Sequence, residues 1–71
     1  MNKVYNRIES ITGNVITVRA KGIRNNELAT VSTRFGKSLA EVIKIEGDLV
    51  SLQVFAGGKG VSTGDEVRFL G

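Results

Sequence analysis

The sequence predicts an all-β fold, a small closed barrel of six antiparallel strands. Glycine occurs nine times and proline is absent. The glycines mostly lie about ten residues apart, and short apolar segments rich in β-branched residues lie between them. Short segments separated by turn residues at regular spacing are typical of small barrels and sandwiches. A chain of 71 residues has room for one core, so residues 1–71 are expected to form a single domain.

The first half of the chain is expected to supply three strands. Residues 4–11 end at a threonine–glycine turn, and residues 14–20, NVITVRA, are rich in β-branched side chains that favour strands. The polar stretch 21–26 contains a glycine and paired asparagines and is interpreted as a loop. Residues 27–33 continue as the third strand, and residues 34–37, RFGK, are interpreted as a turn.

Residues 38–46, SLAEVIKIE, carry two conflicting signals. Ser38 followed by Glu41 matches a helix capping box, but the segment is short and rich in β-branched residues. Gly47-Asp48 follows directly and suits the two-residue turn of a β-hairpin. Because a hairpin needs a strand on each side of its turn, residues 38–46 are predicted to be a strand.

Two further strands complete the predicted barrel. Residues 49–55 alternate between apolar and polar side chains, and residues 66–70 form the last strand. Each of these segments contains a phenylalanine, Phe55 and Phe69, that we expect to be buried. Closing the six strands into a barrel removes the exposed edges that an open sheet would leave.

The glycine-rich stretch 53–67, QVFAGGKGVSTGDEV, raises the question of a phosphate site. A P-loop requires Gly-Lys-Ser/Thr directly before a helix, because backbone amides and the helix N-terminus hold the phosphates. Here Lys59 is followed by Gly60, and the next predicted element is a strand. A dinucleotide-binding motif is also excluded, because the sequence predicts no βαβ unit. We therefore interpret the glycines as corners of the barrel.

Composition argues against an enzyme, a metalloprotein and a membrane-spanning protein. The chain has neither histidine nor cysteine, and its seven carboxylates are scattered without an acid–base pair or a calcium-loop pattern. No apolar run is long enough to span a bilayer, and the N-terminus lacks a signal sequence. The net charge of +3 is modest and identifies no partner. A cytoplasmic domain is expected.

Residues 52–71, LQVFAGGKGVSTGDEVRFLG, resemble the end of the N-terminal β-barrel domain of the rotary ATPases of the V-type and archaeal type. The matching positions are Gln53, Val54, Phe55, Gly57, Gly60 and Val61. Residues 5–13 resemble the family's opening strand and its glycine turn, so the likeness covers nearly the whole chain. The ending VRFLG is similar to the non-catalytic B-type chain rather than the catalytic A-type chain.

The resemblance implies an N-terminal fragment of a longer subunit. In the family a nucleotide-binding domain follows the barrel, so ATP or ADP would bind there and no cofactor is expected within residues 1–71. Barrels of three A-type and three B-type chains form a crown on the hexameric head, and the B-type barrels anchor the peripheral stalk, subunits E and G. The implied role is structural, in a membrane-associated complex on the cytoplasmic face that couples ATP synthesis or hydrolysis to H⁺ or Na⁺ transport.

Contacts between barrels are expected to use exposed turns and strand faces with polar or mixed charges. The candidate interface residues are Arg7, Glu9, Arg19, Lys21, Arg24, Arg34, Phe35 and Lys37. For Phe35 two interpretations stay open, an interface aromatic or a ring folded over the barrel mouth as core. For the basic residues of the 19–24 loop, the alternatives are a solvated loop and an acidic stalk partner.

A nucleic-acid-binding barrel of the OB or cold-shock type is the alternative function. Such barrels stack bases on exposed aromatic side chains beside basic residues. The four aromatics are Tyr5, Phe35, Phe55 and Phe69. Because two of them are expected to be buried, the chain lacks the run of exposed aromatics and lysines that this function requires, and no nucleic-acid partner is expected.

Overall fold

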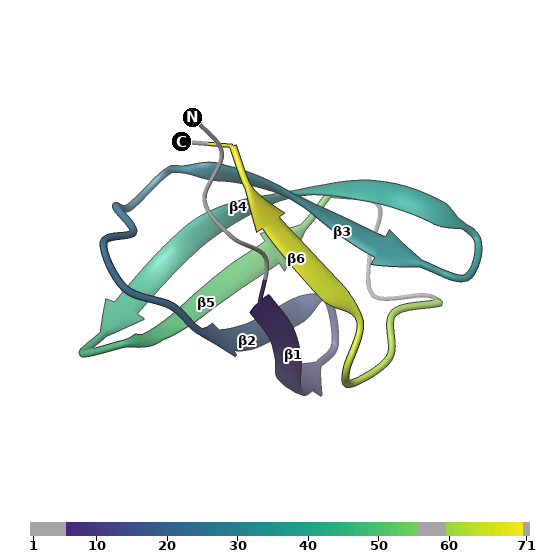
Figure 1. Cartoon of the computed structure of the whole chain (residues 1–71), viewed down its shortest axis with the longest axis horizontal. Helices are drawn as coiled ribbons and strands as arrows, with labels where there is room; N and C mark the ends of the chain where they lie inside the picture. The colour runs from purple at the N-terminus through teal and green to yellow at the C-terminus, as the bar shows by residue number, and fades with distance from the viewer. Residues whose placement is uncertain (1–5, 56–59, 71) are drawn as a thin grey trace.

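The computed structural model describes residues 6–55 and 60–70, and all regular secondary structure within these ranges is β-strand (Figure 1). The six strands are β1 (Asn6–Thr12), β2 (Val15–Arg19), β3 (Leu28–Thr33), β4 (Gly36–Glu46), β5 (Leu49–Val54) and β6 (Glu66–Phe69). They form a closed barrel in the order β1-β2-β5-β4-β3-β6, and all neighbours are antiparallel. The predicted fold class is confirmed. No helix in the described ranges has the length and apolar character needed to cross a bilayer.

The segment with conflicting signals is a strand, as predicted. β4 begins at Gly36, two residues before the predicted start, so Gly36 and Lys37 belong to the strand and the turn shortens to Arg34 and Phe35. Its first half pairs with β3 and its second half with β5, which makes it the longest of the six strands (Figure 1). Backbone hydrogen bonds on both sides therefore outweigh the local capping signal of Ser38 and Glu41.

The predicted hairpin turn at Gly47-Asp48 is also confirmed. Glu46 pairs with Leu49, leaving two residues to connect β4 to β5. Gly47 occupies the first position of this turn with a φ of 63°, the conformation that a type II′ turn requires there. Glycine adopts this conformation without the steric cost that other residues incur.

Side chains from every strand point into the barrel and form its core, and they alternate with outward-facing ones except at the register shifts in β1 and β4. The buried apolar residues are Ile8, Ile16, Val18, Ala29, Val31, Ala40, Val42, Val50, Leu52, Val54, Val67 and Phe69. No polar or charged residue is buried among the described residues. At one level of the barrel, Phe69 lies opposite Ala29 and Ala29 lies opposite Ala40. The two small alanines leave the space that the large ring fills.

The two phenylalanines that were predicted to be buried differ in their exposure. Phe69 is fully buried, as expected, but Phe55 is 54% exposed and that prediction is wrong. Val50, Leu52 and Val54 all point inward, so the next residue along the chain must point outward. The fourth aromatic, Tyr5, lies outside the described residues.

Candidate interaction surfaces

The described residues contain no group of three or more histidine, cysteine or acidic side chains that could hold a metal ion. The glycine cluster at 57–59, including Lys59, lies outside the described residues. The eight predicted interface residues are all exposed on the outer surface of the barrel, and they fall in several separate places.

The hairpin tip, which we define as residues 34–37, consists of the two-residue turn between β3 and β4 and the first two residues of β4. Phe35 lies at its end and is 77% exposed, so the interpretation of Phe35 as core is excluded. The hydroxyl of Thr33 accepts a hydrogen bond from the Phe35 N–H at 3.1 Å and donates one to the Gly36 carbonyl at 2.8 Å. Two bonds from one hydroxyl hold the short turn in a fixed conformation.

The ring of Phe35 contacts the backbone of Gly60, in the segment that leads to β6. A Cβ placed on Gly60 would lie 2.4 Å from Cδ2 and 2.9 Å from Cε2 of Phe35, closer than real Cβ atoms approach other atoms. The ring thus occupies the place where any other residue would have its side chain. Most of the ring surface nevertheless faces solvent.

Two cations lie close to Phe35 in the sequence. Arg34 precedes Phe35 and Lys37 follows it by two residues, and both are exposed. Neither forms an ion pair with another described residue. The hairpin tip therefore carries one exposed aromatic side chain and two exposed cations.

Arg7 is paired elsewhere, along the contact of β1 with β6. Its guanidinium lies 3.5 Å from a carboxylate oxygen of Glu66 and donates a hydrogen bond of 3.0 Å to the Gly64 carbonyl. The Arg7 side chain is exposed, so the ion pair contributes little to stability.

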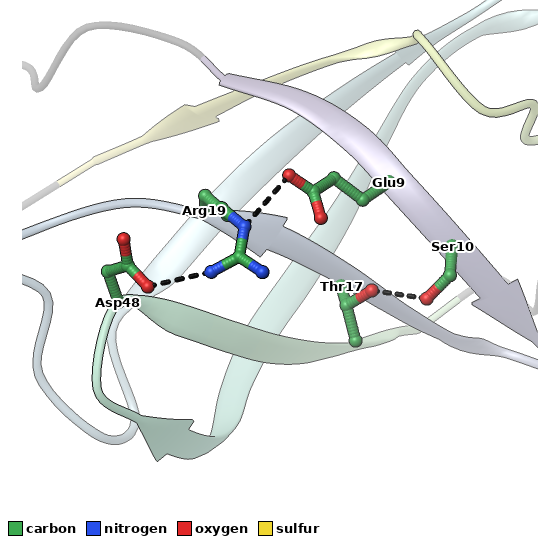
Figure 2. Close-up of polar contacts among 5 residues, drawn as sticks. All are labelled: Glu9, Ser10, Thr17, Arg19 and Asp48. Carbon is green, nitrogen blue, oxygen red and sulfur yellow. Dashed lines mark hydrogen bonds and ion pairs between the residues drawn. The ribbon is translucent and has the colours of Figure 1, made fainter.

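Arg19 links three parts of the barrel surface (Figure 2). Its Nε lies 3.2 Å from Glu9 on β1, and its Nη1 lies 2.9 Å from Asp48 in the β4–β5 turn. Beside them, the hydroxyls of Ser10 and Thr17 form a hydrogen bond across β1 and β2. This polar face places two of the predicted residues, Glu9 and Arg19, in direct contact with each other.

The Arg19–Asp48 pair is expected to stabilise the fold slightly. In a double-mutant cycle of Arg19→Gln and Asp48→Asn, the coupling should be about 0.2–1 kcal/mol at low salt and decrease at high salt, because both groups are solvated. Urea denaturation measures it. The Lys44–Glu46 pair, 3.5 Å apart and more exposed, is the control and should show a smaller coupling. A coupling at Arg19–Asp48 that does not change with salt would contradict this account.

Lys21 and Arg24 extend from the loop between β2 and β3, and both are exposed. The Glu27 side chain fixes the loop, because its Oε2 accepts a 2.7 Å hydrogen bond from the Arg24 N–H. The other carboxylate oxygen, Oε1, is buried without a partner among the described residues. Asn26 donates to Glu41 at 3.0 Å and so ties the loop to β4. Neither of the two cations forms an ion pair with a described residue.

Four exposed apolar side chains on the outside of the barrel were not predicted from the sequence. These side chains, which we call the outer apolar stripe, are Leu28, Leu39, Phe55 and Leu70. They lie in neighbouring pairs: the Leu70 N–H donates to the Leu28 carbonyl, and the Phe55 N–H donates to the Leu39 carbonyl, each at 2.9 Å. Alternation was the available signal, because each of these residues directly adjoins an inward-facing one.

Comparison with known proteins shows what this barrel is similar to. Residues 8–71 match the model of the ATP synthase alpha/beta family, beta-barrel domain. Over 71 residues the chain is 76% identical to the V-type ATP synthase beta chain of Treponema denticola. It is 59% identical to that of Borreliella burgdorferi (strain ZS7) and 45% identical to that of Protochlamydia amoebophila. The whole chain, or 99% of it, is covered in each case, but it spans only 16% of each relative's length.

Proposed function

The chain belongs to the ATP synthase alpha/beta family, as that family's β-barrel domain, and from this premise we propose that it is a non-catalytic assembly domain of a V-type ATP synthase. It would form part of a longer beta chain, the non-catalytic B-type chain of the complex, whose nucleotide-binding region lies outside residues 1–71. ATP or ADP would bind in that region, and the barrel would hold neighbouring chains in place.

In this role the barrel joins those of the neighbouring catalytic (A-type) and non-catalytic (B-type) chains in a crown on the hexameric head. It also anchors the peripheral stalk, subunits E and G. The complex is membrane-associated, with the head on the cytoplasmic face, and couples ATP synthesis or hydrolysis to H⁺ or Na⁺ transport. A closed barrel suits a position that must resist torque, because each strand is hydrogen-bonded on both sides.

The exposure of Phe35 is the observation that supports this proposal. Each strand of the closed barrel already has a neighbouring strand on both sides, so side chains are the main means by which the barrel can contact a partner. Aromatic side chains are enriched in the centres of protein interfaces, and a phenylalanine that is 77% exposed at a fixed turn is costly to keep in water. The nucleic-acid alternative gains no support from the family match.

Replacing Phe35 with alanine in the full-length beta chain is expected to weaken its association with the catalytic A-type chain roughly 30-fold, the effect of removing an interface hot spot. The free energy of unfolding should change by less than about 1 kcal/mol, because Phe35 lies outside the core. Sedimentation velocity of the mixed chains measures association, and urea denaturation measures stability.

Phe55→Ala is the matched comparison, since it removes a second exposed phenylalanine that belongs to the outer apolar stripe. If the Phe35→Ala variant associated as strongly as the wild-type chain, the assignment of the hairpin tip as an interface would be contradicted. If Phe55→Ala alone weakened association, the contact would lie on the outer apolar stripe instead. Salt-sensitive binding of oligo-dT by the wild-type barrel would favour the nucleic-acid alternative.

A further inference from the structure

Gly60 is in direct contact with the hairpin tip although the two are far apart in the sequence. The segment that begins at residue 60 lies beside the β3–β4 turn (Figure 1), and the Phe35 ring occupies the space of a Gly60 side chain. The φ of Gly60 is 84°, a conformation that L side chains rarely adopt. Two properties of glycine, its backbone freedom and its missing Cβ, are therefore used at this one position.

The backbone at Phe35 is fixed by the Thr33 hydroxyl, which accepts a hydrogen bond from the Phe35 N–H and donates one to the Gly36 carbonyl. An exposed phenylalanine on a mobile loop would lose rotamer freedom when a partner binds it. Here the Thr33 hydroxyl fixes the backbone and one edge of the ring rests against Gly60, so part of that loss occurs on folding. Preorganisation of this kind raises affinity without adding any contact.

We infer that Gly60 is a positioning residue that holds Phe35 as a preformed anchor for another protein, one whose surface offers an apolar hollow edged by carboxylates. This inference rests on the assembly role proposed above. The hollow would receive the exposed part of the ring. The carboxylates would face Arg34 and Lys37, which lie within two residues of Phe35 in the sequence and pair with no described residue.

A protein fits this surface better than a nucleic acid. Single-stranded nucleic acids are bound by several aromatic side chains in succession along a basic groove. The hairpin tip offers one exposed aromatic ring together with two cations, which suits a single apolar hollow with charges at its edge. Charges at the edge of an interface act mainly on the association rate and its salt dependence, whereas a central aromatic acts mainly on the lifetime of the complex.

Gly64 provides a matched control for Gly60. Its φ is 89°, close to that of Gly60, but a Cβ added there would meet nothing within 4 Å. Alanine at either position should therefore cause similar backbone strain. Only Gly60→Ala should also displace the Phe35 ring, so the difference between the two variants isolates the contact.

The test has two independent readouts. In the 71-residue chain, nuclear Overhauser contacts should join the Phe35 ring protons to the Gly60 α-protons, and Gly60→Ala should change the ring's chemical shifts whereas Gly64→Ala should not. In the full-length beta chain, Gly60→Ala should weaken association with the catalytic A-type chain about 3- to 10-fold more than Gly64→Ala does. In a Phe35→Ala background, this difference between the two alanine variants should vanish.

The outcomes separate this inference from the proposed function. If Phe35→Ala weakens association but Gly60→Ala and Gly64→Ala have equal effects, Gly60 does not position the ring and the inference is wrong. If Phe35→Ala has no effect, the proposed interface and the inference both fail. Replacing Arg34 and Lys37 with glutamine should slow association and flatten its salt dependence. Binding of oligo-dT that Phe35→Ala abolishes would identify a nucleic-acid site and overturn the protein partner.

Discussion

Replacing Phe69 with alanine is expected to lower the free energy of unfolding by about 3–5 kcal/mol, because the change removes the largest fully buried side chain of the core. A domain of this length has a total stability of about 4–11 kcal/mol, so the substitution would remove between about a quarter of that stability and all of it. The cavity cannot easily collapse, since Ala29 and Ala40 beside it are too small to fill it. Urea denaturation followed by circular dichroism measures the loss.

Leu70→Ala is the control for Phe69→Ala at the next position in the chain. Leu70 is 42% exposed and points outward, so its loss should change the stability by less than about 1 kcal/mol. Equal effects of the two substitutions would mean that the inward and outward faces of β6 are assigned incorrectly. The pair therefore tests the register of the last strand as well as the packing of the core.

Most of the fold follows from periodicity and turn residues. β4 is the strand whose sequence carries conflicting helix and strand signals. Ser38 and Glu41 have the spacing of a helix cap, but Ser38 pairs with Val31, and Glu41 pairs with residues on both neighbouring strands. From the sequence, the β-branched residues and the Gly47-Asp48 turn favoured a strand, and the turn indicated pairing with residues 49–55. A turn two residues long constrains both of its flanking segments at once, which is why it outweighed a local helix signal.

The surface was harder to predict than the core. The exposure of Phe35 was one of two open interpretations, because a residue in a turn can fold inward or outward. Its contact with Gly60 joins segments 25 positions apart and leaves no local signal. By contrast, the exposure of Phe55 could have been predicted from alternation alone. The error came from weighting the hydrophobicity of one aromatic residue above the periodicity of its strand.

The second large effect is expected from Ala29→Phe, which directs a second aromatic ring into the barrel directly opposite Phe69. Both positions are fully buried, so the added atoms have no solvent to enter and must displace packed neighbours. Overpacking typically costs about 1–3 kcal/mol and occasionally more, and so large an addition should lie at or above the upper end of that range. Urea denaturation again provides the measurement.

Combining Ala29→Phe with Phe69→Ala should recover part of the stability that each substitution loses alone. The double variant exchanges a large and a small side chain across paired strands and keeps the total core volume, so we expect a coupling of about 1–3 kcal/mol. Ala40→Phe combined with Phe69→Ala is the control, because Ala40 lies one strand further from Phe69 and should compensate less. Strictly additive losses in the Ala29–Phe69 pair would show that the two side chains do not share one space, and the packing described for this level of the barrel would then be wrong.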